Sequence, residues 1–426
     1  MKVLLLISTL DVAGRRNNRE HAALRELGPR YDRVIVVFRC RAPAGKPRVR
    51  LLRSEVRRWQ DGTVVWVSVD PALNAPEGAV RGATTARPGA GALRRALGRA
   101  LDAAAILRDR LTIRALTDAA ARELRGLEPG SLDVEAFGPW AAEAARRLRG
   151  RGLIRAFAYV DRDYEPGFVS SALRQAWARR MERRAARSAD LVLSIGRRLA
   201  ARHLRDAGVT ATLSPTGVEA GLFDAPPRPS RPLRIAYVGE VAPWSALDVL
   251  IEALDHPGLA EARLSVRGPA LPGYRAHVQA LAAPLGNRFD WPGDVERSSI
   301  PGLLAGANLG WCVFRPTPLR VYAAPLKLLE YLAAGLPVLA LPGSEAGDMV
   351  QAARAGLPAE ADPLAVRAAL LAVQADPAGH AAMSAQAVKL AAEHDWRVIM
   401  AREAALLAGL RRADAGAASA VPEAAE

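Results

Sequence analysis

Cysteine is scarce in this chain of 426 residues, which has only Cys40 and Cys312. Two isolated thiols supply neither a zinc-ligand pattern nor a disulfide framework, which excludes the small cysteine-rich domains of secreted proteins. No run of about 18 uncharged apolar residues occurs, so the sequence predicts no membrane-spanning helix. The opening MKVLLLISTL is too short and too polar for a secretory signal, and it predicts a buried first strand. The two cysteines fit a reduced cytoplasm.

Lysine is also rare, because only four of the 59 basic residues are lysine and 55 are arginine. The formal net charge of +15 would attract phosphate polyanions without sequence preference. The arginines are spread over helical stretches, without the interleaved aromatic residues of single-strand binders, and a GC-rich coding sequence explains their excess over lysine. We therefore predict no nucleic-acid partner. Attraction to an anionic membrane face or to a phosphate-bearing acceptor stays open.

The length predicts two domains, each with its own hydrophobic core. In the first half, apolar runs alternate with helical segments, as in a parallel α/β sheet. The runs are Val3–Ile7, Val34–Phe38, Val64–Val69, Leu132–Phe137, Leu153–Val160 and Leu191–Ile195. Residues 92–127 predict a pair of basic amphipathic helices, which either pack on the core with a solvated arginine face or adsorb to a membrane.

A proline-rich segment at 225–232, APPRPSRP, predicts the joint between the domains, since its four prolines forbid a continuous helix or central strand. Residues 1–224 are the predicted first domain, and 233–395 form a second doubly wound unit. Residues 396–412 predict a helix that returns toward the first domain. Residues 413–426, rich in Ala, Gly and Ser, predict a disordered tail.

The most informative segment is PLKLLEYLAAGLPVLA at 325–340. Lys327 and Glu330 lie three residues apart, on one side of a predicted helix. A lysine beside a helix N-terminus favours phosphate oxygens, and a carboxylate on the same side can accept hydrogen bonds from a ribose diol. The alternative is a surface ion pair between the same two residues.

This segment resembles the donor-site signature of glycosyltransferase family 4, the group 1 glycosyltransferases, whose pattern reads P-x-K-x-x-E-Y-x-A-x-G-x-P-V. Further pieces follow in the order of that family along almost the whole chain. They are ADLVLS at 189–194, Gly217-Val218 with Phe223, the strand and turn at 236–239, the run at 347–357, and His394 to Trp396 before the last helix.

The resemblance implies a GT-B fold, with two Rossmann-like doubly wound domains that face an interdomain cleft. It implies a hexosyltransferase that moves a sugar from a nucleotide diphosphate donor to a glycan or lipid-linked acceptor of polysaccharide or cell-envelope synthesis. Retention of the anomeric configuration, no metal and no cofactor besides the co-substrate are further expectations. The enzyme would be cytoplasmic, and it would contact the membrane peripherally if its acceptor is lipid-linked.

For the donor site, the resemblance implies Glu330 on the ribose, and backbone amides near Gly239 and Gly268 on the diphosphate. The chain departs from the family at three places. Tyr322 stands where a second carboxylate usually contacts the donor sugar. The two cations that usually hold the diphosphate correspond to Glu240 and to Trp244-Ser245.

A diphosphate needs positive charge or well-aimed amides. The candidate cations are Lys327 and two arginines at predicted strand ends, Arg267 and Arg315, each of which is otherwise an ordinary surface arginine.

In the first domain, the glycine-rich loop of the family corresponds to DVAGRRNN at 11–18. Gly14 permits close approach of the backbone to a sugar. Arg15 and Arg16 are candidates for binding a phosphate or carboxylate of the acceptor, or are simply exposed loop cations.

Asp161 and Asp163 follow a predicted strand, where a carboxylate can orient or deprotonate an acceptor hydroxyl. They are the candidate catalytic residues. The competing interpretation is helix capping, which is common for aspartate before a helix.

Two other functions share the predicted fold. A sugar-nucleotide epimerase would use Glu330 but would need additional acid and base residues. A catalytically silent homologue, which binds within a polysaccharide assembly system, is suggested by Tyr322, Glu240 and Trp244.

Overall fold

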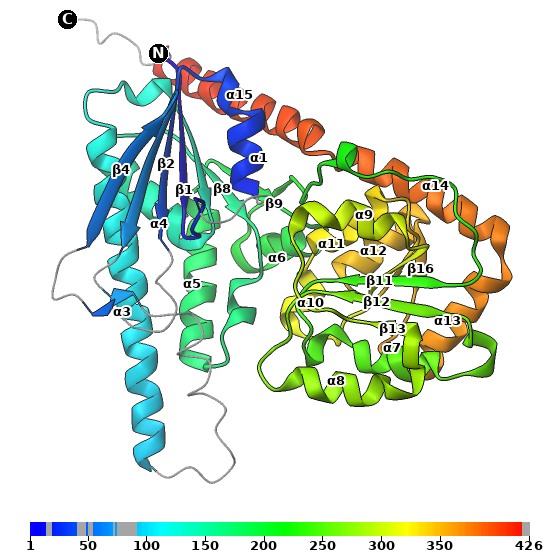
Figure 1. Ribbon diagram of the computed structural model, residues 1–426. Coiled ribbons are helices and arrows are strands. Elements are labelled where there is room, and N and C mark those ends of the chain that lie inside the picture. Colours follow the sequence, from blue (N-terminus) through cyan, green and yellow to red (C-terminus); the bar gives the residue numbers. More distant parts are fainter. Residues whose placement is uncertain (14–18, 41–47, 50–53, 71–72, 75–91, 420–426) are drawn as a thin grey trace, which may run out of the picture. The chain divides into compact units, whose positions relative to one another are not determined.

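The computed structural model describes residues 1–13, 19–40, 48–49, 54–70, 73–74 and 92–419 (Figure 1). The chain divides into two compact units. The first contains Met1–Ser214 and Met400–Glu426, and the second contains Pro215–Ile399. The proline-rich segment 225–232 lies within the second unit, shortly after the division at Ser214.

The first unit is built on an eight-stranded sheet in the order β10-β9-β8-β7-β1-β2-β5-β4. All neighbours are parallel except β4, which pairs antiparallel to β5 at the edge. The strands are β1 Val3–Ser8, β2 Arg33–Arg39, β4 Glu55–Asp61, β5 Val64–Asp70, β7 Leu132–Phe137, β8 Ala158–Asp161, β9 Leu191–Ser194 and β10 Thr212–Leu213. A small antiparallel pair joins β3 Arg48–Val49 to β6 Leu73–Asn74.

The helices of the first unit are α1 Arg19–Glu26, α3 Ala92–Glu123, α4 Pro139–Gly150, α5 Ala172–Ser188 and α6 Arg197–Ala207. The last helix, α15 Trp396–Ser419, belongs to this unit from Met400 onward. The predicted helix pair at 92–127 is wrong, because α3 is one continuous helix of 32 residues. It contains no proline, and it is rich in alanine, leucine and arginine, which are strong helix formers.

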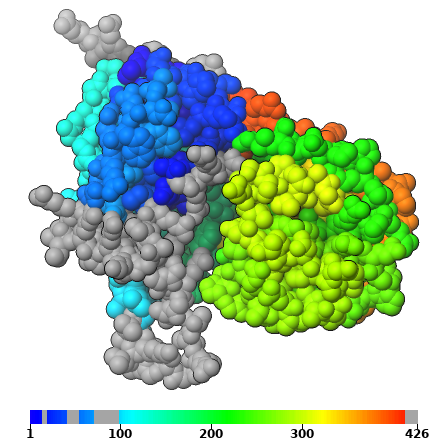
Figure 2. Space-filling model, in the orientation of Figure 1, coloured from blue at the N-terminus to red at the C-terminus, as the bar shows by residue number. Residues whose placement is uncertain are grey.

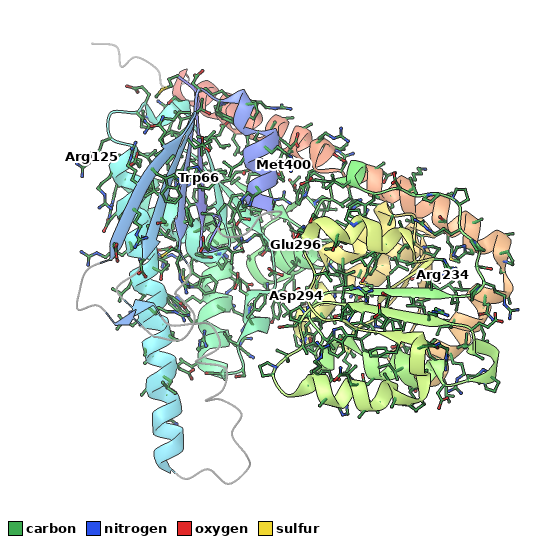
Figure 3. The ribbon with its side chains drawn as sticks, in the orientation of Figure 1. Trp66, Arg125, Arg234, Asp294, Glu296 and Met400 are labelled. Atoms are coloured by element: carbon green, nitrogen blue, oxygen red, sulfur yellow. The ribbon has the colours of Figure 1, made fainter. Side chains whose placement is uncertain are left out.

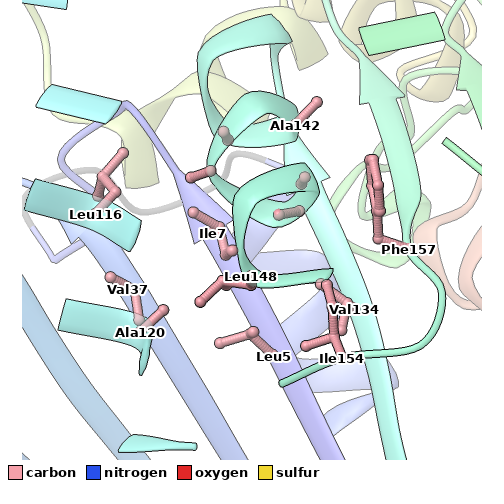
Figure 4. Close-up of a cluster of buried hydrophobic side chains, with 14 of the residues drawn as sticks. Leu5, Ile7, Val37, Leu116, Ala120, Val134, Ala142, Leu148, Ile154 and Phe157 are labelled. Atoms are coloured by element: carbon pink, nitrogen blue, oxygen red, sulfur yellow. The ribbon is translucent and has the colours of Figure 1, made fainter. Parts of the chain in front are cut away.

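The core of the first unit lies between the middle of the sheet and helices α3, α4 and α5. Alternate residues of β1, Leu5 and Ile7, point toward α4, where they meet Leu148 (Figure 4). Leu116 and Ala120 of α3 cover Val37 of β2 in the same cluster (Figure 4). Helical spacing on the helices and alternation on the strands therefore produce one apolar layer.

The second unit is built on a six-stranded parallel sheet in the order β13-β12-β11-β14-β15-β16. Its strands are β11 Arg234–Val238, β12 Arg263–Arg267, β13 Phe289–Asp290, β14 Leu309–Cys312, β15 Val338–Ala340 and β16 Gly356–Pro358. Its helices are α7 Leu247–Leu254, α8 Tyr274–Ala282, α9 Ile300–Ala305, α10 Pro318–Tyr322, α11 Leu326–Ala333, α12 Glu345–Ala353, α13 Pro363–Ala375 and α14 Pro377–Glu393. In Figure 2 the face of this unit that is turned to the viewer comes mainly from the green and yellow part of the chain, its first half.

Both faces of this second sheet are buried, which explains its continuous apolar runs. Ile235 and Tyr237 of β11 point into a core with α7 and α13. Ala236 and Val238 of the same strand point into another core with α11 and α14. The strand order reverses between β11 and β14, and this reversal makes the second unit doubly wound.

Short 3-10 helices complete the connections. They are η1 Gly28–Arg30, η2 Pro129–Ser131, η3 Glu165–Phe168, η4 Ala220–Leu222, η5 Pro243–Ser245, η6 Pro257–Leu259, η7 Ala283–Arg288 and η8 Arg297–Ser299. Within the described residues, no helix has the length and apolar composition needed to cross a bilayer.

Candidate functional site

Two glycines at the carboxyl ends of neighbouring strands lie against each other in the second unit. Gly239 follows β11 and Gly268 follows β12, with φ angles of +134° and +133°. Residues with a side chain rarely adopt such angles. A Cβ atom on Gly268 would lie 2.2 Å from the carbonyl oxygen of Gly239. This closely packed edge adjoins the reversal of strand order, where open α/β sheets bind their ligands.

Lys327, the second residue of α11, directs its ammonium group to this edge. A Cβ atom on Gly239 would lie 2.5 Å from Lys327 Nζ, so the ammonium group lies directly against this glycine. Nζ is buried, lies 3.9 Å from the centre of the Tyr237 ring, and has no hydrogen-bond acceptor among the described residues. Burial lowers the pKa of Lys327 to about 8. A buried ammonium without an acceptor is costly, and an anion bound beside Gly239 would offset that cost.

Glu330 lies one helical turn after Lys327, and its side chain is 4% exposed. Its Oε1 atom accepts a hydrogen bond from Nη2 of Arg297, the first residue of η8. Burial raises the pKa of Glu330, while the charges of Arg297 and Lys327 oppose that rise. No described residue donates a hydrogen bond to the other oxygen, Oε2. Glu330 is thus a fixed carboxylate with one acceptor oxygen left for a ligand.

Helix α11 is held against the sheet by Tyr331, the residue after Glu330. Its ring is fully buried against Gly310 of β14. A Cβ atom on Gly310 would lie 2.6 Å from that ring, so the glycine lets the helix approach the strand. The positions of Lys327 and Glu330 therefore depend on a close contact between α11 and β14.

Arg320 of α10 brings a second cation to the same region, which sequence reasoning missed. Its guanidinium carbon lies 3.7 Å from the centre of the Trp244 ring and 5.7 Å from that of Phe314. Lys327 Nζ lies 5.6 Å from the same Phe314 ring. Burial has the largest effect on the pKa of Lys327, and Cys312 has the second largest. The third is the positive charge of Arg320, which lowers this pKa. The two cations are therefore close neighbours.

The other predicted donor cations are engaged within the protein. Arg267 pairs with Asp290, with Nη2 to Oδ2 at 2.5 Å. Arg315 pairs with Asp248 and also donates from Nε to the carbonyl oxygen of Pro243 at 3.1 Å. The structure brings Gly239, Gly268, Lys327 and Glu330 together, and we call these four residues the strand-end site.

Tyr322, which replaces the second carboxylate of the family pattern, is the last residue of α10 and is half-buried. The loop before η8 carries Asp294 and Glu296. Figure 3 shows both at the opposite end of the sheet from Arg234, the first residue of β11. Arg297 follows directly after them, and its pairing with Glu330 was not predicted, because 33 residues separate the two.

In the first unit, Asp161 ends β8 and is 1% exposed. Its Oδ2 atom lies 2.6 Å from Nε2 of His203, and its Oδ1 atom accepts a hydrogen bond from the Tyr159 hydroxyl at 3.2 Å. Asp163 lies two residues later in the loop before η3 and is half-buried. Both oxygens of Asp161 thus bond to residues of the same unit, and the catalytic roles of the two aspartates stay predictions.

A carboxylate that sequence reasoning missed lies at the end of β1. Glu20 of α1 is 1% exposed, and its Oε1 atom accepts hydrogen bonds from the Ser8 hydroxyl, at 2.7 Å, and from Arg162. Its Oε2 atom is buried without a partner among the described residues. Gly138, with a φ of +85°, lies beside the Arg162 guanidinium. These residues cluster at the ends of β1, β7 and β8.

The predicted acceptor-binding residues Gly14, Arg15 and Arg16 lie outside the described residues. Among the described residues, no group of three or more His, Cys, Asp or Glu side chains is arranged to hold a metal ion.

The comparisons with known proteins agree on the fold. Residues 232–376 match the family model described as glycosyl transferases group 1. No curated protein matches the sequence.

Solved structures share the fold. One is sucrose-phosphate synthase from Thermosynechococcus elongatus, with a TM-score of 0.70 at 16% identity over 97% of this chain and 100% of that one. Anabaena HepE in complex with UDP has a TM-score of 0.62 at 17% identity, over 96% and 100%. A trehalose-6-phosphate structure from E. coli, bound with UDP-2-fluoro glucose, has a TM-score of 0.63 at 13% identity, over 95% and 99%.

These matches define the fold of the chain. Two Rossmann-like domains built on parallel sheets, as predicted, are confirmed, and the fold is that of the GT-B glycosyltransferases. The residues that match the group 1 glycosyltransferase model belong to the second unit, and the strand-end site lies within them.

Proposed function

We propose that the protein transfers a sugar from a nucleoside diphosphate sugar to a hydroxyl-bearing acceptor, with the donor bound at the strand-end site. The observation that carries this proposal is the ammonium group of Lys327. It is buried beside Gly239 without a hydrogen-bond acceptor among the described residues, at the strand ends where α/β folds bind nucleotides. The group 1 glycosyltransferase match over 232–376 and the UDP in the HepE structure support the same ligand class.

Each residue of the site has a defined task in this proposal. Lys327 pairs with the diphosphate, and the amides that follow β11 and β12 bind its oxygens. Glu330, held by Arg297, accepts hydrogen bonds from the ribose hydroxyls through Oε2. Arg320, stacked on Trp244, supplies the second positive charge that the departures at Glu240 and Trp244 remove from the family pattern.

The reaction breaks the bond between the anomeric carbon and the β-phosphate oxygen. A bond forms between the acceptor oxygen and the same carbon, and the hydroxyl proton is released. Negative charge grows on the departing diphosphate, so cations and amides fixed around it stabilise the transition state more than the ground state. The resemblance to family 4 favours retention at the anomeric carbon, a glycan or lipid-linked acceptor, and a role in polysaccharide or cell-envelope synthesis. It also favours a peripheral membrane contact.

Donor binding tests the proposal directly. UDP, GDP and ADP, each free and as its glucose ester, are titrated into the purified chain by isothermal calorimetry. We expect Lys327→Met and Glu330→Ala each to weaken binding of the preferred nucleotide by about 1–3 kcal/mol, the usual effect of losing a charged hydrogen-bond partner. The exposed Lys389→Met and Glu393→Ala on α14 are matched controls that should bind as the parent does.

Unchanged affinity in Lys327→Met would contradict the assigned site. Absence of binding for every nucleotide would favour the catalytically silent homologue. Release of free nucleotide diphosphate without any acceptor, at the same rate as with one, would favour the epimerase.

A further inference from the structure

A basic cavity lies in the first unit. Helices α3, α4 and α5 pack side by side along one face of the sheet (Figure 1) and border a cavity of about 780 Å³ that is open to solvent. Pockets that hold small ligands typically measure about 300–1,000 Å³. The cavity is therefore large enough for a phosphate-bearing headgroup.

The lining of this cavity is strongly positive. Five arginines line it together with one carboxylate, Glu143. The carboxylate is already shared, since it pairs with Arg146, Arg147 and Arg184 at 2.8, 3.2 and 3.2 Å. Although burial opposes it, these arginines lower the pKa of Glu143, which stays ionised. One negative charge divided among three guanidinium groups leaves the cavity with excess positive charge.

Two of the lining arginines have no carboxylate partner. Neither Arg110 nor Arg180 forms an ion pair within the part of the chain that the structure describes. Arg110 lies over the ring of Trp177, with its guanidinium carbon 5.3 Å from the ring centre. The indole Nε1 atom of Trp177 is buried and has no acceptor among the described residues. Two exposed guanidinium groups without a carboxylate partner and one buried indole N–H without an acceptor are donors available to an anion.

Apolar side chains form the remaining wall of the cavity, among them Leu111 and Met181. Arg110 and Arg180 are exposed, as in a simple solvated arginine face, the competing explanation, but they line one concave surface together with a buried indole donor that has no acceptor among the described residues. The geometry combines a polar donor set with an apolar floor, which suits a phosphate that carries an organic group.

We propose that the α3–α4–α5 cavity is a binding site for a phosphate-bearing ligand, separate from the strand-end site. Arg110, Arg180 and the Trp177 indole donate to the phosphate oxygens. The proposal does not depend on sugar transfer, because none of these residues belongs to the strand-end site.

The test uses the full chain and two probes, which distinguish a soluble phosphate from a lipid headgroup. Inorganic pyrophosphate is titrated by calorimetry, and vesicles of phosphatidylcholine with and without phosphatidylglycerol are sedimented with the protein. We expect the Arg110→Gln, Arg180→Gln double variant to weaken binding of at least one probe about tenfold or more. The Arg57→Gln, Arg263→Gln double variant removes the same charge from exposed positions outside the cavity and should bind as the parent does.

Trp177→Phe keeps the aromatic ring and removes the N–H donor, so we expect weaker binding of the same probe without loss of the fold. Circular dichroism and the thermal unfolding midpoint verify that each variant is folded. If the Arg110→Gln, Arg180→Gln variant loses affinity for pyrophosphate, the ligand is a soluble phosphate. If it loses affinity for phosphatidylglycerol vesicles, the ligand is a lipid. Equal loss in both double variants, or no binding of either probe by the parent chain, would overturn the proposal.

Discussion

The hydroxyl of Tyr331 accepts a hydrogen bond from the backbone amide of Val238 at 2.7 Å. This bond joins helix α11, which carries Lys327 and Glu330, to the last residue of β11, directly before Gly239. The amide would otherwise be a buried donor without a partner. The bond thus fixes the helix and the strand end relative to each other.

Replacing this tyrosine tests how much the bond contributes. In Tyr331→Phe the ring still packs on Gly310, but the Val238 amide loses its acceptor. We expect the unfolding free energy of the second unit to fall by about 1–3 kcal/mol, the usual cost of a buried donor left unpaired. Urea unfolding, monitored by tryptophan fluorescence, measures this free energy. Tyr274→Phe is the control, since no described residue bonds to that hydroxyl, and an equal loss in both variants would show that the bond contributes nothing special.

The second prediction concerns Arg320. If its guanidinium replaces the cations missing at Glu240 and Trp244, Arg320→Gln should weaken nucleotide diphosphate binding about tenfold, the effect of one charged hydrogen bond. The affinity for the free nucleoside, which carries no phosphate, should fall much less. Arg234→Gln is the matched control, because Arg234 is exposed at the opposite end of β11 (Figure 3). Calorimetry with UDP and with uridine measures both affinities. If the variant binds both ligands more weakly by the same factor, Arg320 does not contact the phosphates.

Much of the fold was predictable because apolar periodicity is local. The strand at Leu132–Phe137 has the predicted bounds, and the predicted run Val3–Ile7 lies within β1. The antiparallel edge strand β4 was missed. Its sequence, EVRRWQD, is polar because most of the strand is exposed, so it lacks the apolar signal of a buried strand.

The site was predictable only where its residues are close in sequence. Lys327 and Glu330 share one helical turn, and both belong to the short segment that resembles the family 4 donor-site signature. The pairings of Arg297 with Glu330 and of His203 with Asp161 join residues 33 and 42 positions apart, and only the tertiary fold brings them into contact. Arg320 was missed for the same reason, since its partner Trp244 belongs to another element.

Asp161 provides the third prediction. Because its two oxygens bond to His203 and Tyr159 inside the first unit, we expect Asp161→Asn to lower the unfolding free energy by about 1–3 kcal/mol. Nucleotide affinity, which depends on the second unit, should change less than about twofold, a difference near the noise of such free energies. Thermal unfolding and UDP calorimetry measure the two effects. A variant with unchanged stability and no transfer activity would instead assign Asp161 to catalysis.

The last prediction follows from the burial of Lys327. Its pKa is lowered to about 8 in the unliganded protein, and a bound diphosphate favours the charged ammonium and raises that pKa. Above pH 8 the complex therefore binds more protons than the free protein, so affinity falls as pH rises. Between pH 7 and pH 9 we expect the Kd for UDP-glucose to rise about tenfold, because the free lysine is then mostly neutral.

Stability of the unliganded protein should follow the opposite trend. In the unfolded chain the pKa of the lysine is about 10.4. Between this value and the lower pKa of the folded protein, the unfolded chain therefore binds more protons than the folded one. Over that window the contribution of Lys327 to the unfolding free energy rises with pH. Lys327→Met isolates both effects, since it should show a flat Kd between pH 7 and pH 9 and lack this rise. A parent and a variant with the same pH dependence in calorimetry would show that the ammonium of Lys327 does not contact the diphosphate.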